Sequence, residues 1–209
     1  MWDYRPILKI FTKEPTGSFT IRQLSKDSNL AYGTTHKCVV EILSKEKIVT
    51  ITSLGKSKLV KLNLENPDTA RYLAEAEIDI LRDYKKNNKK IFQNLNTLLG
   101  SLQNALKHSI YSALLFGSYA KGKATSKSDI DLLIIKSETK GKNNEVADII
   151  SPWEFEHNIK INPVIQTPEE YIKMLKNKAI LPLQIIENHI VLLNSETYWR
   201  FTIKGLKND

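Results

Sequence analysis

Cysteine is almost absent from this sequence, since Cys38 is the only one among 209 residues. One cysteine cannot form an internal disulfide, so the chain has no disulfide framework and suits a reducing compartment such as the cytosol. The four histidines show no metal-ligand spacing with Cys38, which argues against a zinc site. Cys38 lies beside an apolar helical stripe, and we expect it to be a buried small hydrophobe rather than a reactive thiol.

Long apolar runs are also absent. No run reaches the roughly 18 residues of a membrane-spanning helix, and the N-terminus lacks the apolar stretch of a signal peptide. We therefore expect a cytoplasmic protein without a membrane partner. Disorder is excluded by the 41% content of hydrophobic residues, and the length allows two small domains with cores of their own.

The richest segment is residues 115–135, LFGSYAKGKATSKSDIDLLII. The apolar run from Ser112 to Phe116 predicts a buried strand, which breaks at Gly117 and Ser118 before a helix that can start at Ala120. Free backbone N–H groups at a helix start attract phosphate oxygens, and a glycine lets a ligand approach the main chain closely. The pattern predicts a phosphate-binding turn.

Two acids follow this turn. Asp129 and Asp131 stand two apart at the head of an apolar run, so in a strand both carboxylates project from one face. Adjacent anions repel, but a hard cation neutralises them, and Mg²⁺ favours one or two carboxylates plus substrate phosphates. Taken alone, the two acids would equally suit a surface loop in which they cap a turn.

The whole pattern of strand, Gly-Ser turn and Asp-x-Asp in an apolar strand resembles the DNA polymerase β-like nucleotidyltransferase superfamily, especially its minimal nucleotidyltransferase branch. The resemblance implies that residues 110–209 form a small mixed sheet with flanking helices. It implies a nucleoside triphosphate substrate, with Mg²⁺ or Mn²⁺ as the metal. The implied roles are phosphate binding for Gly117, Ser118, Lys121 and Ser128, and catalysis and metal ligation for Asp129 and Asp131.

The family carries a third carboxylate on a neighbouring strand, which here corresponds to residues 159–165. The matching position is Asn162. An amide oxygen can ligate a hard metal, but it cannot accept a proton from an attacking hydroxyl near neutral pH. Glu154 and Glu156 are alternative acids, because the sequence does not determine the strand register.

Residues 1–66 form the predicted N-terminal domain. Apolar spacing predicts a helix over residues 2–12, a second from a capping box at Thr20 to near Asn29, and a third capped by Thr34 or Thr35 after a turn at residues 31–33. Strands over residues 48–51 and 59–64 would complete a hairpin. This order resembles the winged helix-turn-helix domain, which implies binding of double-stranded DNA. The implied contacts are Thr34, Thr35, His36 and Lys37 on the third helix, with Lys56 and Lys58 at the wing.

Charge favours the same interpretation. Residues 1–66 carry 11 Lys and Arg against 6 Asp and Glu, so five of the eight net positive charges lie there, while residues 110–209 carry 13 against 12. Other interpretations stay open, because winged helices also bind proteins and His36 would also suit an ordinary exposed position. Residues 67–109 read as a helical connector in which residues 85–90 form either a solvated face or a bend, and this connector could also pair two subunits in a homodimer.

The sequence thus predicts an α+β chain with a winged helix-turn-helix, a helical connector and a nucleotidyltransferase fold. The leading hypothesis is transfer of a nucleotidyl group to an unknown acceptor, and an antitoxin that nucleotidylates a partner protein is one variant. The rival is a DNA-binding transcriptional regulator whose nucleotidyltransferase domain is catalytically weak and senses nucleotide or binds a protein. Asn162 is the feature that favours the rival.

Overall fold

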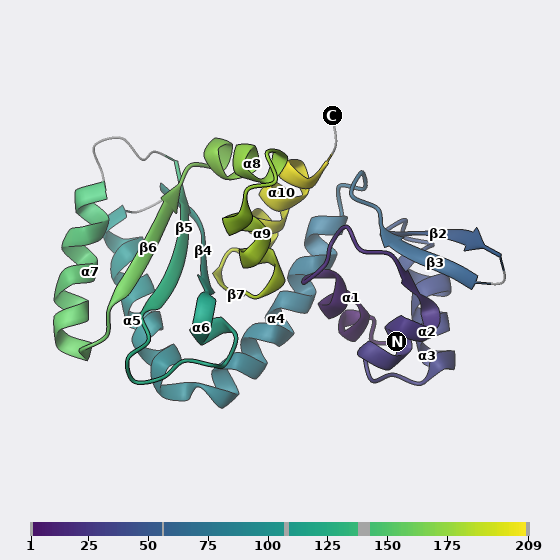
Figure 1. The fold of residues 1–209 in the computed structure, drawn as a ribbon, viewed down its shortest axis with the longest axis horizontal. Coiled ribbons are helices and arrows are strands. Elements are labelled where there is room, and N and C mark those ends of the chain that lie inside the picture. The colour runs from purple at the N-terminus through teal and green to yellow at the C-terminus, as the bar shows by residue number, and fades with distance from the viewer. Residues whose placement is uncertain (1, 56, 107–108, 138–142, 208–209) are drawn as a thin grey trace.

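The computed structural model describes residues 2–55, 57–106, 109–137 and 143–207. Figure 1 shows two lobes joined along the long helix α4 (Thr69–Asn87). The N-terminal lobe holds helices and a three-stranded sheet of order β1-β3-β2, and the C-terminal lobe holds a four-stranded sheet of order β6-β5-β4-β7. The chain is therefore an α+β protein with a small mixed sheet and flanking helices.

The N-terminal lobe contains α1 (Arg5–Phe11), β1 (Phe19–Thr20), α2 (Ile21–Asp27), α3 (Tyr32–Lys37), a continuing π-helical segment η1 (Cys38–Leu43), β2 (Val49–Leu54) and β3 (Ser57–Leu62). The predicted capping box at the start of α2 is confirmed, because the Thr20 hydroxyl accepts from the Gln23 N–H while the Gln23 side chain accepts from the Thr20 N–H. Cys38 is buried, in agreement with its expected packing role.

Two local predictions in this lobe were wrong. The third helix begins at Tyr32 rather than after Gly33, because the chain turns earlier, at Asn29 with φ +56°. The strands of the hairpin extend into the predicted loop, since β2 and β3 pair from Val49 with Leu62 to Leu54 with Ser57. The paired strands thus leave two residues between them, where the prediction had seven.

The C-terminal lobe begins with α5 (Lys89–Leu106), which follows the predicted bend; the break lies at Asn88. The sheet strands are β4 (Ile110–Phe116), β5 (Ile130–Lys136), β6 (Ile161–Gln166) and β7 (Ile190–Leu193). The helices are α6 (Gly117–Ala120), α7 (Asn143–His157), α8 (Pro168–Lys176), α9 (Ile180–Glu187) and α10 (Ser195–Leu206). The resemblance implied flanking helices without bounds, and the structure supplies these bounds.

Residues on β5 alternate between two cores on opposite faces of the sheet. Leu133 and Ile135 pack in one core with residues of α8 and α10, while Leu132 and Ile134 pack in the other with residues of α5 and α7. The side of the sheet that carries Leu133 also carries Asp131, because these residues are two apart. This alternation places the candidate site on the α8 and α10 side.

The first of these cores crosses the predicted boundary at residue 66. It contains Leu8 of α1, Leu43 of η1, Leu73 of α4 and Trp199 of α10. The two lobes therefore share buried apolar packing across residue 66.

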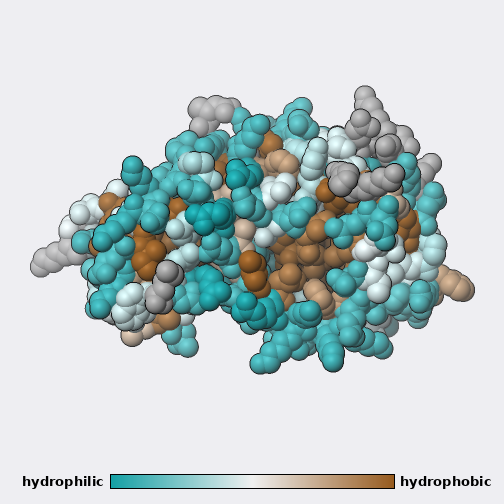
Figure 2. All heavy atoms as spheres, turned by 180° about the vertical axis from the view of Figure 1, so that it is seen from behind, coloured by the Kyte–Doolittle hydropathy of each residue, from teal (hydrophilic) through white to brown (hydrophobic). Residues whose placement is uncertain are grey.

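The surface of the molecule is uneven in polarity. Seen from behind, the largest continuous apolar area lies over the lobe with the four-stranded sheet (Figure 2). Side chains with substantial exposure in that lobe include Tyr111, Phe155, Ile180 and Leu183. Among the described helices, none is long and apolar enough to cross a lipid bilayer.

Candidate functional site

The candidate site lies at one end of the four-stranded sheet, where β4 ends and both β5 and β6 begin. Antiparallel register pairs Phe116 with Asp131, and parallel register pairs Asp131 with Asn162. Asp131 therefore has the Gly117 turn on one side and Asn162 on the other. The structure brings together three of the residues singled out in the sequence.

Gly117 has a backbone conformation in which any other residue type would be strained. Its φ is +68°, and a Cβ built at this position would overlap the Asp131 carboxylate. The helix α6 that follows is a single turn, with its N-cap at Phe116 and no side-chain cap. N–H groups in a first helical turn have no partner within the helix, so they remain available for phosphate oxygens beside Asp131.

The loop between α6 and β5 is held by a small hydrogen-bond motif. Ser128 Oγ accepts from the Thr125 N–H at 2.9 Å, and the Ser128 N–H donates to the Thr125 carbonyl at 3.1 Å. The Ser128 hydroxyl thus shapes the turn immediately before Asp129. Lys121 is exposed at the C-cap of α6, where its charge faces solvent.

The two aspartates have few protein partners. Asp131 Oδ1 accepts from Asn162 Nδ2 at 3.3 Å, while Asp129 is exposed and makes no hydrogen bond or ion pair with the described residues. Nor do the described residues contain a cluster of three or more His, Cys, Asp or Glu side chains suited to a metal. The donor set is two carboxylates and one amide oxygen, which suits a hard cation that takes its other ligands from phosphates or water.

Neither alternative acid completes this set. Glu154 Oε1 accepts from the Ile161 N–H at 2.7 Å and its Oε2 pairs with Lys160 at 3.3 Å, so both oxygens are engaged in holding the start of β6. Glu156 is exposed on α7, whose apolar side chains pack on the other face of the sheet from Asp131. Asn162 is therefore the side chain that stands next to Asp131 on β6.

The predicted DNA contacts are not all accessible. Thr35 is fully buried and donates its hydroxyl to the Ala31 carbonyl at 3.2 Å, so its assignment as a DNA contact is wrong. The cause is the earlier start of α3, which turns Thr35 toward the core. Lys37 is exposed, with its Nζ 4.9 Å from the centre of the Trp2 ring, and Lys56 lies outside the described residues.

A groove of about 520 Å³ runs between α2, α3 and the hairpin. It is lined by Arg22, Tyr32, His36 and Lys58 together with Thr20, Ile21 and Ser57. None of these described lining residues is acidic. Arg22 is the second residue of α2 and Tyr32 is the first residue of α3, and both were missed in the sequence because the start of each helix sets the direction of these side chains.

A second feature missed in the sequence is a buried polar network. Glu77 Oε1 on α4 lies 3.0 Å from His189 Nε2 and accepts from Trp199 Nε1 at 3.2 Å. His189 Nδ1 lies 3.0 Å from the carbonyl oxygens of Ile185 and Ile186, so Nδ1 is the protonated nitrogen that donates to them. The 112 residues between Glu77 and His189 explain why no local pattern reveals the pair.

The protonation of His189 follows from these contacts. Burial alone lowers the pKa of His189, but the Glu77 carboxylate, its hydrogen bond and the two carbonyls outweigh burial and raise the pKa above its ordinary 6.5. The pair fixes α4 to the turn before β7 and to α10. It is a structural contact on the side of α4 that faces the four-stranded sheet.

Comparison with known families agrees with the geometry at the end of the sheet. Residues 100–198 match the family model described as Polymerase beta, Nucleotidyltransferase. This region is therefore similar to nucleotidyltransferases. It contains the Gly117 turn, both aspartates and Asn162, and it supports a transferase as the class of enzyme.

Two relatives come from Methanocaldococcus jannaschii. "Putative protein adenylyltransferase MJ1305" is 26% identical over 126 residues, which cover 57% of this chain and 83% of the relative. "Putative protein adenylyltransferase MJ0141" is 29% identical over 105 residues, which cover 49% of this chain and 87% of the relative. No solved structure matches the chain significantly.

Proposed function

We propose that the nucleotidyltransferase domain transfers an adenylyl group from a metal-bound nucleoside triphosphate to a hydroxyl of an acceptor protein. One observation carries the proposal: Gly117 packs directly on Asp131, whose neighbours in the site are Asp129 and Asn162. A phosphate held at the turn would lie against the carboxylate pair. The names of the two relatives support adenylyl transfer and a protein acceptor.

Each residue has a distinct role in this proposal. The backbone N–H groups after Gly117 and the Ser118 hydroxyl bind phosphate oxygens, and Lys121 adds a positive charge. Asp129 and Asp131 hold Mg²⁺ or Mn²⁺, with the Asn162 amide oxygen as a weaker ligand. Ser128 acts indirectly, because its hydroxyl fixes the turn that sets the position of Asp129.

In the transfer step the acceptor oxygen attacks the α-phosphorus, and the bond to pyrophosphate breaks. The bound metal ion supplies charge stabilisation for the phosphate oxygens. Asn162 cannot take the acceptor proton, and Asp131 Oδ1 already faces the Asn162 amide. Asp129 has no partner among the described residues, so one of its two oxygens can receive that proton, which we expect to give a slow but measurable transfer.

The test measures binding and transfer separately. Calorimetry with ATP, with and without Mg²⁺, is combined with label transfer from ATP carrying radioactive α-phosphate. Asp129→Asn with Asp131→Asn should abolish metal-dependent ATP binding and lower transfer at least about a hundredfold. Equal metal-dependent ATP affinity in both proteins would refute the site. Intact binding with no transfer by the wild type would favour the regulator instead.

A second function, binding of double-stranded DNA by a winged helix-turn-helix, is favoured by the groove beside α3. Arg22, His36 and Lys58 converge on it from α2, α3 and β3, and such a surface suits phosphate oxygens. Thr34 and Lys37 remain partly or fully exposed on the same helix. The DNA contact set that we propose thus gains Arg22 and Tyr32 and loses Thr35.

The full-length chain is the right material for testing DNA binding, because the lobes share a core. Binding to a random duplex pool should weaken steeply with salt. Arg22→Ala with Lys58→Ala should weaken it at least about tenfold at low salt. Lys86→Ala with Lys90→Ala removes the same charge from α4 and α5, and this control should retain binding within about twofold. If both variants lose the same DNA affinity, the effect comes from net charge and the groove is not the binding site.

A further inference from the structure

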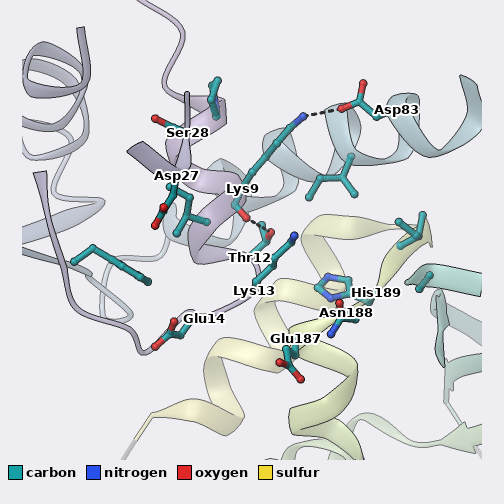
Figure 3. Close-up of a pocket in the computed structure, with 16 residues that line it drawn as sticks. Lys9, Thr12, Lys13, Glu14, Asp27, Ser28, Asp83, Glu187, Asn188 and His189 are labelled. Atoms are coloured by element: carbon teal, nitrogen blue, oxygen red, sulfur yellow. Dashed lines mark hydrogen bonds and ion pairs between the residues drawn. The ribbon is translucent and has the colours of Figure 1, made fainter. Parts of the chain in front are cut away.

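A cleft of about 690 Å³ separates the two lobes beside the candidate site. One wall comes from the ends of α1 and α2, the other from the end of α9 and the start of β7, and α4 contributes Ile80 and Asp83. In Figure 3, Glu14 and Asp27 lie on one side and Glu187, Asn188 and His189 on the other, with Lys13 between them. Its volume is within the range of functional binding pockets.

Both walls of the cleft are fixed to α4. Arg5 Nη1 on α1 pairs with Asp79 at 3.2 Å, and one helical turn further along Lys9 pairs with Asp83 at 2.9 Å. The opposite wall is fixed through the buried contact of His189 with Glu77. Because one helix holds both walls, the cleft is preformed and needs no movement of the lobes to open.

The cleft is locally negative, although the protein as a whole is positively charged. The chain has a net charge of +8, yet the lining carboxylates Glu14, Asp27 and Glu187 are exposed and make no hydrogen bond or ion pair with the described residues. Lys9 is neutralised by Asp83, which leaves Lys13 as the lining lysine without an ion pair among the described residues. The unpaired groups thus give the cleft a local negative charge.

The cleft also adjoins the candidate site through the helix α6. Ala120, the last residue of α6, lines it, and the first residue of the same helical turn is Gly117, which packs on Asp131. A chain lying in the cleft would therefore reach the helical turn to which we assign phosphate binding. This position suits the group that receives the adenylyl unit.

We propose that the cleft binds an extended segment of the acceptor protein in which lysine or arginine side chains flank the modified hydroxyl. The proposal rests on the proposed function and specifies its acceptor as a basic polypeptide. Unpaired carboxylates attract cationic side chains and repel the phosphates of a nucleic-acid acceptor. The cleft and the basic groove beside α3 thus take partners of opposite charge.

The test uses two fluorescein-labelled peptides, Gly-Lys-Arg-Ser-Tyr-Lys-Arg-Gly and its acidic counterpart Gly-Glu-Asp-Ser-Tyr-Glu-Asp-Gly. Fluorescence anisotropy should show binding of the basic peptide to the full chain and no binding of the acidic one. Affinity for the basic peptide should fall at least about tenfold in the variant Glu14→Gln, Asp27→Asn, Glu187→Gln. It should stay within about twofold in the control Glu41→Gln, Asp148→Asn, Glu156→Gln, which removes the same charge from exposed positions elsewhere.

Three results would overturn the proposal: no binding of the basic peptide, equal binding of both peptides, or equal losses in the two variants. Calorimetry with Mg²⁺ and ATP on the same preparations separates this failure from failure of the nucleotide site. The cleft variant should bind Mg²⁺ and ATP as the wild type does. If ATP binding is normal and the peptide result is negative, only the acceptor cleft is refuted.

Discussion

Two sets of acidic side chains lie next to the four-stranded sheet, Glu77 on one hand and Asp129 with Asp131 on the other. They differ in burial and in the number of their partners. Glu77 is 1% exposed, and one of its oxygens meets both His189 and Trp199. Asp129 is exposed without a described partner, and Asp131 has one long hydrogen bond from Asn162. Glu77 has two partners on Oε1, although its buried Oε2 has no hydrogen-bond partner among the described residues, whereas Asp129 has no partner on either oxygen and can take a ligand on both.

This contrast predicts that mutations at the two places separate stability from function. Removal of Glu77 should destabilise the chain, because it leaves the buried His189 Nε2 and Trp199 Nε1 without their partner. Removal of charge at Asp129 and Asp131 should leave stability unchanged or slightly improved, because it relieves repulsion between two anions. The four predictions below run from the largest expected effect to the smallest.

Glu77→Ala should lower the free energy of unfolding by about 3–5 kcal/mol. Glu77→Gln should cost less, because the amide oxygen can still accept from Trp199. Urea unfolding followed by circular dichroism measures both, with Asp148→Ala as a control at an exposed position on α7. A loss no greater than that of the control would show that the network does not hold α4 in place.

Asn162→Asp should place a third carboxylate beside Asp131. Crowding of three anions should lower the melting temperature in chelator by about 2–4 °C, with recovery when Mg²⁺ and ATP are added. Transfer should rise, because the new carboxylate can accept the acceptor proton. Differential scanning fluorimetry and the label-transfer assay measure the two effects. An unchanged melting temperature in both conditions would place residue 162 outside the site.

The stabilisation from His189 should depend on pH. Its folded-state pKa is raised above 6.5, so the stabilisation is fully present below pH 6.5 and is lost as pH rises through the folded value. The difference in urea midpoint between wild type and His189→Gln should therefore shrink from about pH 6 to about pH 9. A difference that stays constant over this range would show that His189 does not exchange its proton there.

Lys9→Ala should have the smallest effect. Its ion pair with Asp83 has side-chain exposures of 31% and 66%, and exposed pairs contribute about 0.2–1 kcal/mol. The loss should shrink further at high salt because the pair is screened. Urea unfolding at low and high salt measures it, and a loss as large as that of Glu77→Ala would contradict the contrast between exposed and buried charges.

The candidate site could be anticipated from sequence because its parts are local. Strand, Gly117 turn and Asp-x-Asp occupy one stretch of chain, and a strand period of two decides which acids share a face. To predict Asn162 as the third position of the site, one needs only one further strand and its register. The choice between Asn162 and the two glutamates came from the structure, since it depends on which face of the sheet α7 covers.

Other features depend on contacts between distant residues. The pairing of Glu77 with His189 and the cleft between the lobes have no local signature. Thr35 was expected at or beside the N-cap, but the N-cap is Ala31, at least three residues earlier, so Thr35 lies inside α3 and is buried. The N-terminal lobe looked independent because its own apolar pattern is complete, although its core continues into α4 and α10.

That continuous core sets a rule for recombination between related genes. A crossover at residue 66 would join an N-terminal lobe to a foreign α4 and place mismatched side chains against Leu8 and Phe11, which are fully buried. A crossover in the break at Asn88 would keep α4 together with the α1 residues that it contacts. It would still separate Glu77 from His189, its partner in this chain. The two halves of this chain are therefore inherited most safely as a single piece.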